Sequence, residues 1–160
     1  MKKQKIEINL EVFEGVSELP TDIKKLMNKA HEAREDAYAP YSHFKVGAAL
    51  LLSSGEIVLG NNQENAAYPS GLCAERVAIF SAGANFPNQE ILALAITARS
   101  ENQPTTDAIA PCGGCRQSLA EYEQKQKSPI ATYFMGESGK VIKVDSIADL
   151  LPLGFDGKYL

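Results

Sequence analysis

The chain has 160 residues, of which 44% are hydrophobic, and this size is typical of one compact domain. Sixteen lysines and arginines against 20 acidic residues give a net charge of −4, without a run of about five like charges, which argues against nucleic acid as a partner. The basic start lacks a continuous apolar core and no stretch of about 18 apolar residues follows, so we expect no secretion signal, no membrane span and a cytoplasmic location.

The first predicted element is a strand near the N-terminus. In the segment QKIEINLEVF, residues 4–13, apolar side chains recur at every second position, which is the period of a half-buried strand. These apolar side chains are Ile6, Ile8, Leu10 and Val12. We expect residues 1–20 to form an N-terminal extension that adds an edge strand, and residues 21–160 to form a single domain.

A helix and a hairpin follow. Thr21 or Asp22 can cap a helix that ends before Pro40, because apolar residues recur there on one helical face. These residues are Ile23, Leu26, Met27, Ala30, Ala33 and Ala37. The segment FKVGAALLLSSGEIVLGNN, residues 44–62, predicts two strands around a Ser54–Gly55 turn. The first of these strands is apolar enough to be covered on both faces.

Helices and strands alternate through the rest of the sequence. The predicted elements are, in order, a helix at 73–84, a strand at 91–100, a helix at 112–125, strands at 130–135 and 140–145, and a short helix at 146–151. Interleaved helices and strands of this kind predict an α/β fold. We expect a three-layer α/β/α sandwich with a mixed five-stranded sheet, to which the N-terminal strand would be added at one edge.

Three cysteines stand where two of these helices begin. Cys112 and Cys115 have the C-x-x-C spacing that lets two thiols bind one metal ion, and Cys73 starts the preceding helix. A helix N-terminus stabilises thiolate, the form that binds metals. Three thiolates with one open position are typical of a catalytic zinc site, whereas a structural site has four protein ligands. A redox dithiol at Cys112 and Cys115 is the alternative.

Two charged residues follow the first cysteine within one helical turn. A carboxylate at Glu75 can point off the helix end, take a proton from water activated by zinc and deliver it to a substrate nitrogen. A guanidinium at Arg76 can hydrogen-bond to the thiolates and offset their charge. The alternatives are a solvated glutamate that complements the helix dipole and an arginine that is only a surface charge.

The motifs FKVGAALL, NNQENAAYPSGLCAERVAIF and PCGGCRQSL occur in this order over Tyr38–Tyr122, and the sequence thereby resembles the small homotetrameric cytidine deaminases. The resemblance implies a homotetrameric zinc enzyme of pyrimidine salvage that acts on a free nucleoside. It would convert cytidine and deoxycytidine to uridine and deoxyuridine with release of ammonia. Gly114 stands where the family more usually has alanine, and the first twenty residues exceed what the family core needs.

The resemblance also implies a role for each site residue. The zinc ligands would be Cys73, Cys112 and Cys115, with Glu75 as the proton shuttle and Arg76 behind the thiolates. The residues implied to contact the nucleoside are Asn62 and Glu64 at the ribose, Phe44 on the pyrimidine and the backbone of Ala74 at the base carbonyl. Those implied to enter the pocket from a neighbouring subunit are Tyr68 and Phe155. Without the cysteine motif, loop and core roles would be the simpler interpretation of these residues.

Two competing functions share parts of this pattern. Blasticidin S deaminases also have the three-cysteine site, but the N-x-E-N frame at residues 62–65 favours a nucleoside, and nucleic-acid editing deaminases usually have histidine in place of Cys73. The other competitor is a structural zinc module without catalysis, which would need His43 as its fourth ligand. Otherwise we expect His31 and His43 at the surface or at the rim of the pocket.

Overall fold

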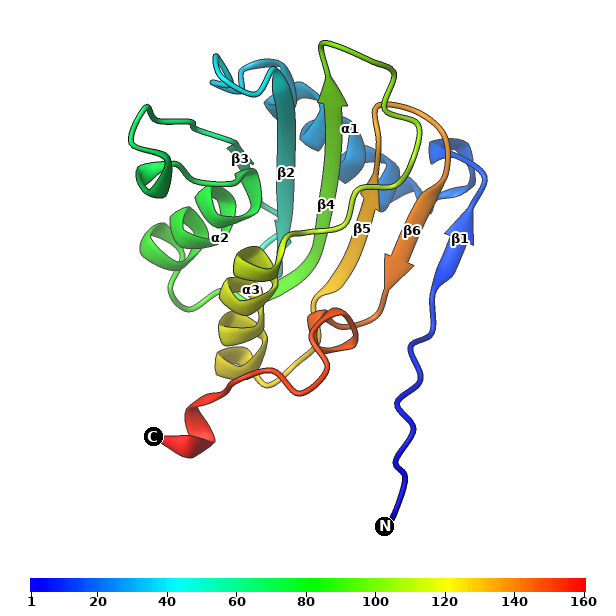
Figure 1. Ribbon diagram of the computed structural model, residues 1–160, viewed down its shortest axis with the longest axis vertical. Coiled ribbons are helices and arrows are strands. Elements are labelled where there is room, and N and C mark those ends of the chain that lie inside the picture. The colour runs from blue at the N-terminus through cyan, green and yellow to red at the C-terminus, as the bar shows by residue number, and fades with distance from the viewer.

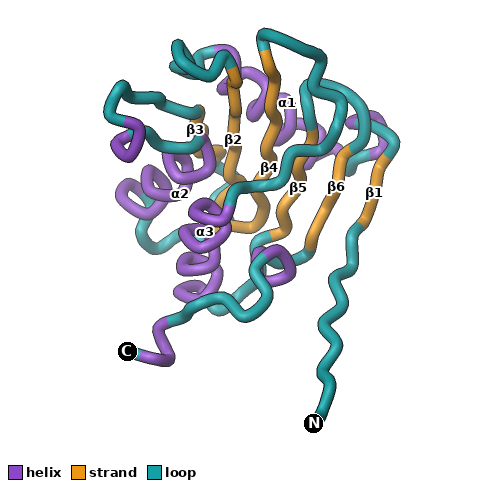
Figure 2. Tube along the Cα trace, in the orientation of Figure 1, coloured by secondary structure: helices purple, strands orange, loops and turns teal.

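The computed structural model describes residues 1–160, apart from the side chain of Tyr159, as a six-stranded sheet with helices on both faces (Figure 1, Figure 2). The strands are β1 Glu11–Phe13, β2 Phe44–Leu52, β3 Ile57–Asn61, β4 Ile91–Ser100, β5 Ala131–Met135 and β6 Val141–Val144. The helices are α1 Thr21–Glu35, α2 Ala74–Asn85 and α3 Gly113–Gln126, with 3₁₀ turns η1 Val16–Glu18, η2 Tyr68–Ser70, η3 Ile147–Leu150 and η4 Gly157–Tyr159. Within the described residues, none of the helices has both the length and the apolar character that crossing a membrane requires.

The sheet is mixed, with the strand order β1-β6-β5-β4-β2-β3. Strands β4 and β5 run parallel, while the other neighbouring pairs are antiparallel. Parallel neighbours need a long crossover connection, and here that connection contains α3. This arrangement confirms the predicted α/β sandwich with a mixed sheet, and β1 provides the extra strand at the edge.

The two helical layers cover opposite faces of the sheet (Figure 1). On one face, Leu26 and Met27 of α1 are fully buried against the strands. On the other face, Ile79 of α2 and Leu119 of α3 are fully buried in a second core. Strand β2 contributes side chains to both cores, which confirms that it is covered on both faces.

The N-terminal strand is shorter than the sequence predicted. Pairing with β6 covers Glu11–Phe13, whereas residues 1–10 lie outside the sheet as an extended tail with exposed side chains (Figure 2). The prediction of a strand over residues 4–13 is therefore wrong for its first part. The reason is the length of the partner strand: because β6 ends at Val144, the position opposite residue 10, it offers no partner to residues 4–9.

Two glycines of the β2–β3 hairpin let helices approach the sheet closely. A Cβ atom on Gly47 would lie 2.0 Å from the carbonyl oxygen of Ala30 in α1. A Cβ atom on Gly60 would lie 2.4 Å from the carbonyl oxygen of Ala74 in α2. Neither position accepts a side chain without displacing a helix. The second contact holds the first turn of α2 against β3, beside Cys73.

Candidate metal centre and active site

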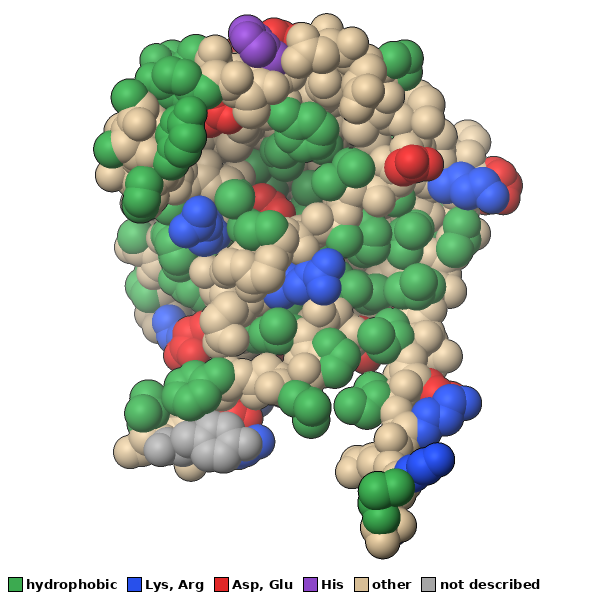
Figure 3. Space-filling view, in the orientation of Figure 1, with side chains coloured by type: hydrophobic (Ala, Val, Ile, Leu, Met, Phe, Trp, Pro, Cys, Tyr) green, Lys and Arg blue, Asp and Glu red, His purple; other side chains and the backbone are tan. Residues whose placement is uncertain are grey.

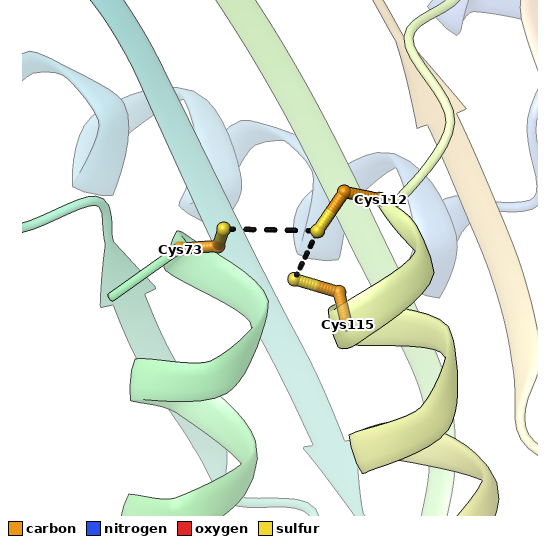
Figure 4. Close-up of side chains that lie close together, drawn as sticks. All are labelled: Cys73, Cys112 and Cys115. Atoms are coloured by element: carbon orange, nitrogen blue, oxygen red, sulfur yellow. Dashed lines mark hydrogen bonds between the residues drawn. The ribbon is translucent and has the colours of Figure 1, made fainter. Parts of the chain in front are cut away.

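The three cysteines come together at the N-termini of two adjacent helices (Figure 4). Cys73 is the N-cap of α2, Cys112 is the N-cap of α3, and Cys115 lies in the first turn of α3. The Sγ atoms of Cys73 and Cys112 are 3.9 Å apart and those of Cys112 and Cys115 are 3.4 Å apart. Tetrahedral zinc with Zn–S bonds of about 2.3 Å needs sulfur atoms about 3.8 Å apart. This donor set therefore fits zinc in both chemistry and spacing.

The three thiols share their protons unevenly. A hydrogen bond from Cys115 lowers the pKa of Cys73 to about 5, and the guanidinium of Arg76 acts in the same direction. The same hydrogen bond, together with burial, raises the pKa of Cys115. At neutral pH the metal-free cluster thus holds a thiolate at Cys73, and metal binding releases the proton that remains on Cys115.

Arg76 lies directly behind the thiols. Its Nη2 atom is 3.7 Å from the Sγ of Cys73 and 3.5 Å from the carbonyl oxygen of Gly71. Its Nε atom is buried and has no hydrogen-bond partner among the described residues. The hydrogen bond to Cys73 raises the pKa of this guanidinium, so it remains a cation beside the sulfur cluster.

Glu75 occupies the first turn of α2 and is buried, with 5% of its surface exposed. Burial raises the pKa of its carboxyl group, the charge of the Cys73 thiolate raises it further, and a hydrogen bond with Cys115 opposes both. A first-turn glutamate that merely complements the helix dipole would lie in solvent. The geometry instead brings a buried carboxyl group next to the thiols.

A cavity of about 490 Å³ extends from the cysteine cluster to the loop after β3. Cys73 and Arg76 line one part of it, and Asn62 and Glu64 line another. The other lining residues are Tyr41, Ser42, Gln63, Asn65, Tyr68, Gly71 and Leu72. The structure therefore places the predicted ribose-contacting residues Asn62 and Glu64 in the same cavity as the predicted metal ligand Cys73.

Asn62 ties the end of β3 to the beginning of β2. Its Oδ1 accepts a hydrogen bond from the backbone N–H of Val46 at 2.7 Å, and its Nδ2 donates to the carbonyl oxygen of Phe44 at 2.9 Å. An amide has two donor hydrogens and two acceptor lone pairs, so one of each remains for another partner. No motif in the sequence indicates this bridge, because it depends on the pairing of β2 with β3.

Glu64 is held as a carboxylate by the segment before β2. Its Oε2 accepts hydrogen bonds from the backbone N–H groups of Tyr41 at 2.9 Å and Ser42 at 3.2 Å. Desolvation opposes ionisation, but the hydrogen bonds from Ser42 and Tyr41 outweigh it and lower the pKa of Glu64. The group at this end of the cavity is consequently an acceptor at neutral pH.

Of the remaining predicted site residues, Tyr68 lines this cavity, whereas Phe44, Ala74 and Phe155 are not among its lining residues. Phe44 is half-buried at the start of β2, and Ala74 is fully buried at the start of α2. Tyr68 is an exposed lining residue whose ring centroid is 6.1 Å from that of Tyr41. Phe155 lies on the C-terminal segment, where its carbonyl oxygen accepts a hydrogen bond from Gln117 of α3 at 3.0 Å.

Arg116 is a residue of this region that the sequence analysis did not single out. Its Nε donates to the carbonyl oxygen of Pro111 at 2.7 Å, and its Nη1 donates to that of Leu150 at 2.8 Å. One side chain therefore joins the turn before Cys112 to the C-terminal segment. Its place directly after the C-x-x-C motif was the available signal, because a side chain there starts within one helical turn of both thiols.

His43 does not join the metal-binding cluster. Its Nδ1 lies 3.2 Å from a carboxylate oxygen of Glu101, and among the described residues the group able to hold a metal consists of the three cysteines. The backbone of His43 is left-handed, with φ of 53°, and its side chain is about half exposed. A four-ligand structural zinc module that uses His43 therefore has no support in this geometry.

Comparison with known proteins gives consistent matches over most of the chain. The family model described as the cytidine and deoxycytidylate deaminase zinc-binding region matches residues 20–130. The chain is 40% identical over 139 residues to a cytidine deaminase of Sporosarcina psychrophila, an alignment that covers 87% of this chain and 95% of that protein. It is 38% identical over 135 residues to a cytidine deaminase of Halalkalibacterium halodurans, with 84% and 94% covered.

Solved structures give the same picture. The crystal structure of cytidine deaminase from Burkholderia pseudomallei superimposes with a TM-score of 0.71 at 42% sequence identity, and the match covers 82% of this chain and 97% of that one. The crystal structure of cytidine deaminase from Mycobacterium tuberculosis superimposes with a TM-score of 0.65 at 30% identity. Its match covers 86% of this chain and 99% of that one.

Proposed function

The chain belongs to the cytidine and deoxycytidylate deaminase family, and from this membership we propose that it hydrolyses cytidine and deoxycytidine to uridine and deoxyuridine. Each turnover replaces the amino group on C4 with an oxygen atom from water and releases ammonia, a reaction of pyrimidine salvage. The observation that carries this proposal is one cavity lined by Cys73 of the thiol cluster together with Asn62 and Glu64. The buried Glu75 lies next to that cluster.

The metal of this reaction is zinc, held by the cluster of Cys73, Cys112 and Cys115. When bound, zinc supplies a Lewis acid that lowers the pKa of a water molecule. Three thiolates bring three negative charges, which weaken that effect. The guanidinium of Arg76 lies 3.7 Å from the nearest sulfur and offsets part of this charge.

Glu75 is the proton carrier in this proposal. Burial raises the pKa of its carboxyl group, which favours the protonated form that can give a proton to the substrate. The carboxylate accepts a proton from the attacking water, and the carboxylic acid then donates it to N3 of the pyrimidine ring. Glu75 then takes the second proton of the former water molecule, which is on the new C4 hydroxyl group, and passes it to the amino group. The amino group departs as ammonia while the C4 carbonyl forms.

The nucleoside is held at both ends. Glu64, ionised at neutral pH, accepts hydrogen bonds from ribose hydroxyl groups, and Asn62 uses its remaining donor and acceptor there. Phe44 packs on the pyrimidine. As the first residue of α2, Ala74 has a backbone N–H without an intrahelical partner, and this group donates to the base carbonyl. Free nucleosides are thereby favoured over blasticidin S.

The protein acts as a cytoplasmic homotetramer in this proposal, in which residues 21–160 form one domain behind an extension at 1–20. Tyr68 is 76% exposed and Phe155 is 56% exposed, and both would complete the pocket of a neighbouring subunit. Leu153, beside Phe155, is 94% exposed. An apolar segment with such exposure is typical of a surface that a second subunit covers.

A deamination assay with four candidate substrates tests the substrate class. Zinc-loaded protein is given cytidine, deoxycytidine, cytosine or blasticidin S, and the absorbance change and ammonia release are followed. We expect turnover of both nucleosides, with much slower or no turnover of cytosine and blasticidin S, because only the nucleosides offer a pentose to Asn62 and Glu64. Faster turnover of blasticidin S or of free cytosine would overturn the nucleoside assignment.

A further inference from the structure

One edge of the sheet is open. β1 is the outermost strand and pairs with β6 on one side, and residues 1–10 continue from it as extended backbone beyond the end of the sheet (Figure 1). An unpaired strand edge presents N–H and C=O groups to any other extended chain. The side chains of residues 5–12 determine which extended chain can pair with this segment as a neighbouring strand.

Apolar and polar side chains alternate along residues 5–12, so that each kind lies on its own face of an extended strand. Phe13 packs into the core beneath α1, so β1 directs its odd-numbered positions to that side. Val12 is paired with Ile142, which packs on the core beneath α2 and α3, and Figure 3 shows hydrophobic side chains gathered over β5, β6 and β1 on that face. The apolar residues at even positions are exposed by 44–53%, namely Ile6, Ile8, Leu10 and Val12. The odd positions are Lys5, Glu7, Asn9 and Glu11.

Residues 5–11 are complementary to themselves in the antiparallel direction. When Ile8 lies opposite Ile8 of a second copy, Ile6 lies opposite Leu10, and Lys5 lies opposite Glu11. The remaining pair is a glutamate opposite an asparagine, so no like charges face each other. Cross-strand pairs of opposite charge and of apolar residues are the stabilising ones.

Other registers lose this complementarity. Sliding one strand by one residue places Ile6, Ile8 and Leu10 opposite charged residues or Asn9, because the side-chain period of a strand is two. Sliding it by two residues places Glu7 opposite either Glu7 or Glu11 of the second copy. Two copies of the tail therefore specify one pairing, centred on Ile8.

We propose that residues 5–11 of two copies of this chain pair as antiparallel strands in the extended segment that leads into β1, so that two six-stranded sheets are linked across a two-fold axis at Ile8. This contact lies outside residues 20–130, which match the family model, and is separate from the tetramer contacts proposed above. It also does not depend on the deaminase reaction.

The charges beside β1 favour a lysine from a second copy. Lys143 of β6 forms ion pairs with Glu11 and, at 2.8 Å, with Asp145. One lysine between two carboxylates leaves a negative charge at this edge. Lys5, which forms an ion pair with Glu7 of its own chain, would supply the missing positive charge when it lies opposite Glu11 of the second copy.

Disulfide trapping in the full-length, zinc-loaded protein tests the pairing. With Ile8→Cys, two thiols lie opposite each other on the two-fold axis, and mild oxidation should yield covalent dimers joined at position 8. Ile6→Cys is the control, because its two copies would be four residues apart, about 13 Å, whereas a disulfide needs Cα atoms within about 7 Å. An equal mixture of Ile6→Cys and Leu10→Cys chains should cross-link again. Peptide mass spectrometry separates these bonds from any that involve the native cysteines.

Charge variants test the register in the same assay. In the Ile8→Cys protein, Lys5→Glu places two glutamates opposite each other twice per dimer, and the dimer yield should fall at least about fivefold. Lys25→Glu, exposed on α1, carries the same change of charge and should leave the yield unchanged. Absence of Ile8→Cys dimers, equal yields from Ile6→Cys, or equal losses from Lys5→Glu and Lys25→Glu would each overturn the proposal.

Discussion

Glu75 is the side chain on which the proposed proton transfers depend. Glu75→Gln should keep the fold and the zinc, because the amide fills the same buried space and the metal ligands are cysteines. Its kcat should fall by roughly 10²–10⁴, since an amide carries no transferable proton. Elemental analysis and the cytidine assay measure the two quantities. Glu121→Gln, exposed on α3, is the control, and near-parental turnover by zinc-loaded Glu75→Gln protein would contradict the shuttle role.

The same residue makes stability depend on pH in a defined direction. Because burial raises the pKa of Glu75 above its ordinary value of 4.5, folding favours the protonated form. Its stabilising contribution is full below pH 4.5 and is lost as the pH rises through the higher pKa of the folded state. Metal-free Glu75→Gln protein lacks this titration, so its melting temperature relative to the parent should rise between pH 4.5 and pH 8. A constant difference across that range would show that the carboxyl group is not desolvated.

Asn62 has a structural task besides its proposed contact with the ribose. Asn62→Ala removes both hydrogen bonds that join β3 to Phe44 and Val46, and loss of these partly buried bonds should cost about 1–3 kcal/mol of unfolding free energy. Its KM for cytidine should rise, while its zinc content stays unchanged. Denaturant unfolding and steady-state kinetics measure the two effects. Glu64→Ala is the comparison, because we expect it to raise KM with a smaller loss of stability.

The sequence predicted the meeting of the three cysteines better than it predicted the partners of the neighbouring residues. Cysteines at helix starts converge whenever the helices lie side by side on one face, and α2 and α3 do so (Figure 4). The double hydrogen bond of Asn62 depends instead on which residues of β2 face the end of β3. A short polar side chain in a loop motif carries no information about that register.

Among the elements, α2 depends on its contact with the β2–β3 hairpin. Gly60→Ala would place a Cβ atom 2.4 Å from the carbonyl oxygen of Ala74, so the first turn of α2 must move away from β3. We expect a stability loss of about 1–3 kcal/mol together with weaker zinc binding, because Cys73 moves with that turn. Thermal melts and chelator competition are the measurements. Gly113→Ala, in open space at the start of α3, is the control, and equal effects would argue against the close contact.

Element positions followed from periodicity, while element lengths did not. The helix expected after Pro20 is α1, Thr21–Glu35, and the apolar run at residues 91–100 is β4. The alternation in residues 4–13 is as regular as in any strand, yet β1 holds three residues, because its partner β6 is itself four residues long. Strand pairing joins distant segments, so the extent of an edge strand is set by a neighbour that its own sequence does not describe.

For the whole molecule, subunit complementation tests the proposed sharing of active sites. Glu75→Gln and Phe155→Ala should each be poorly active alone, the first within its own pocket and the second in the pocket of a neighbour. After the two proteins are dissociated, mixed and reassembled, about a quarter of the sites should combine an intact Glu75 with an intact neighbouring Phe155. A mixture of Glu75→Gln and Glu75→Ala proteins is the control and should recover nothing. No recovery in the first mixture would place each active site within a single chain.

The cysteine cluster also has a consequence for the order of folding. Cys73 and Cys112 are 39 positions apart in the chain, and β4 lies between them. Before the crossover to β5 is complete, α3 is not beside α2, and a nascent chain offers zinc at most the local pair Cys112 and Cys115. Full metal affinity thus arises late, and a bound ion closes a loop of about forty residues, which restricts the unfolded ensemble. During refolding, zinc should therefore bind at the same rate at which the parallel β4–β5 pair forms. Because parallel pairing of distant segments is slow, the rate of zinc binding reports the rate of this folding step.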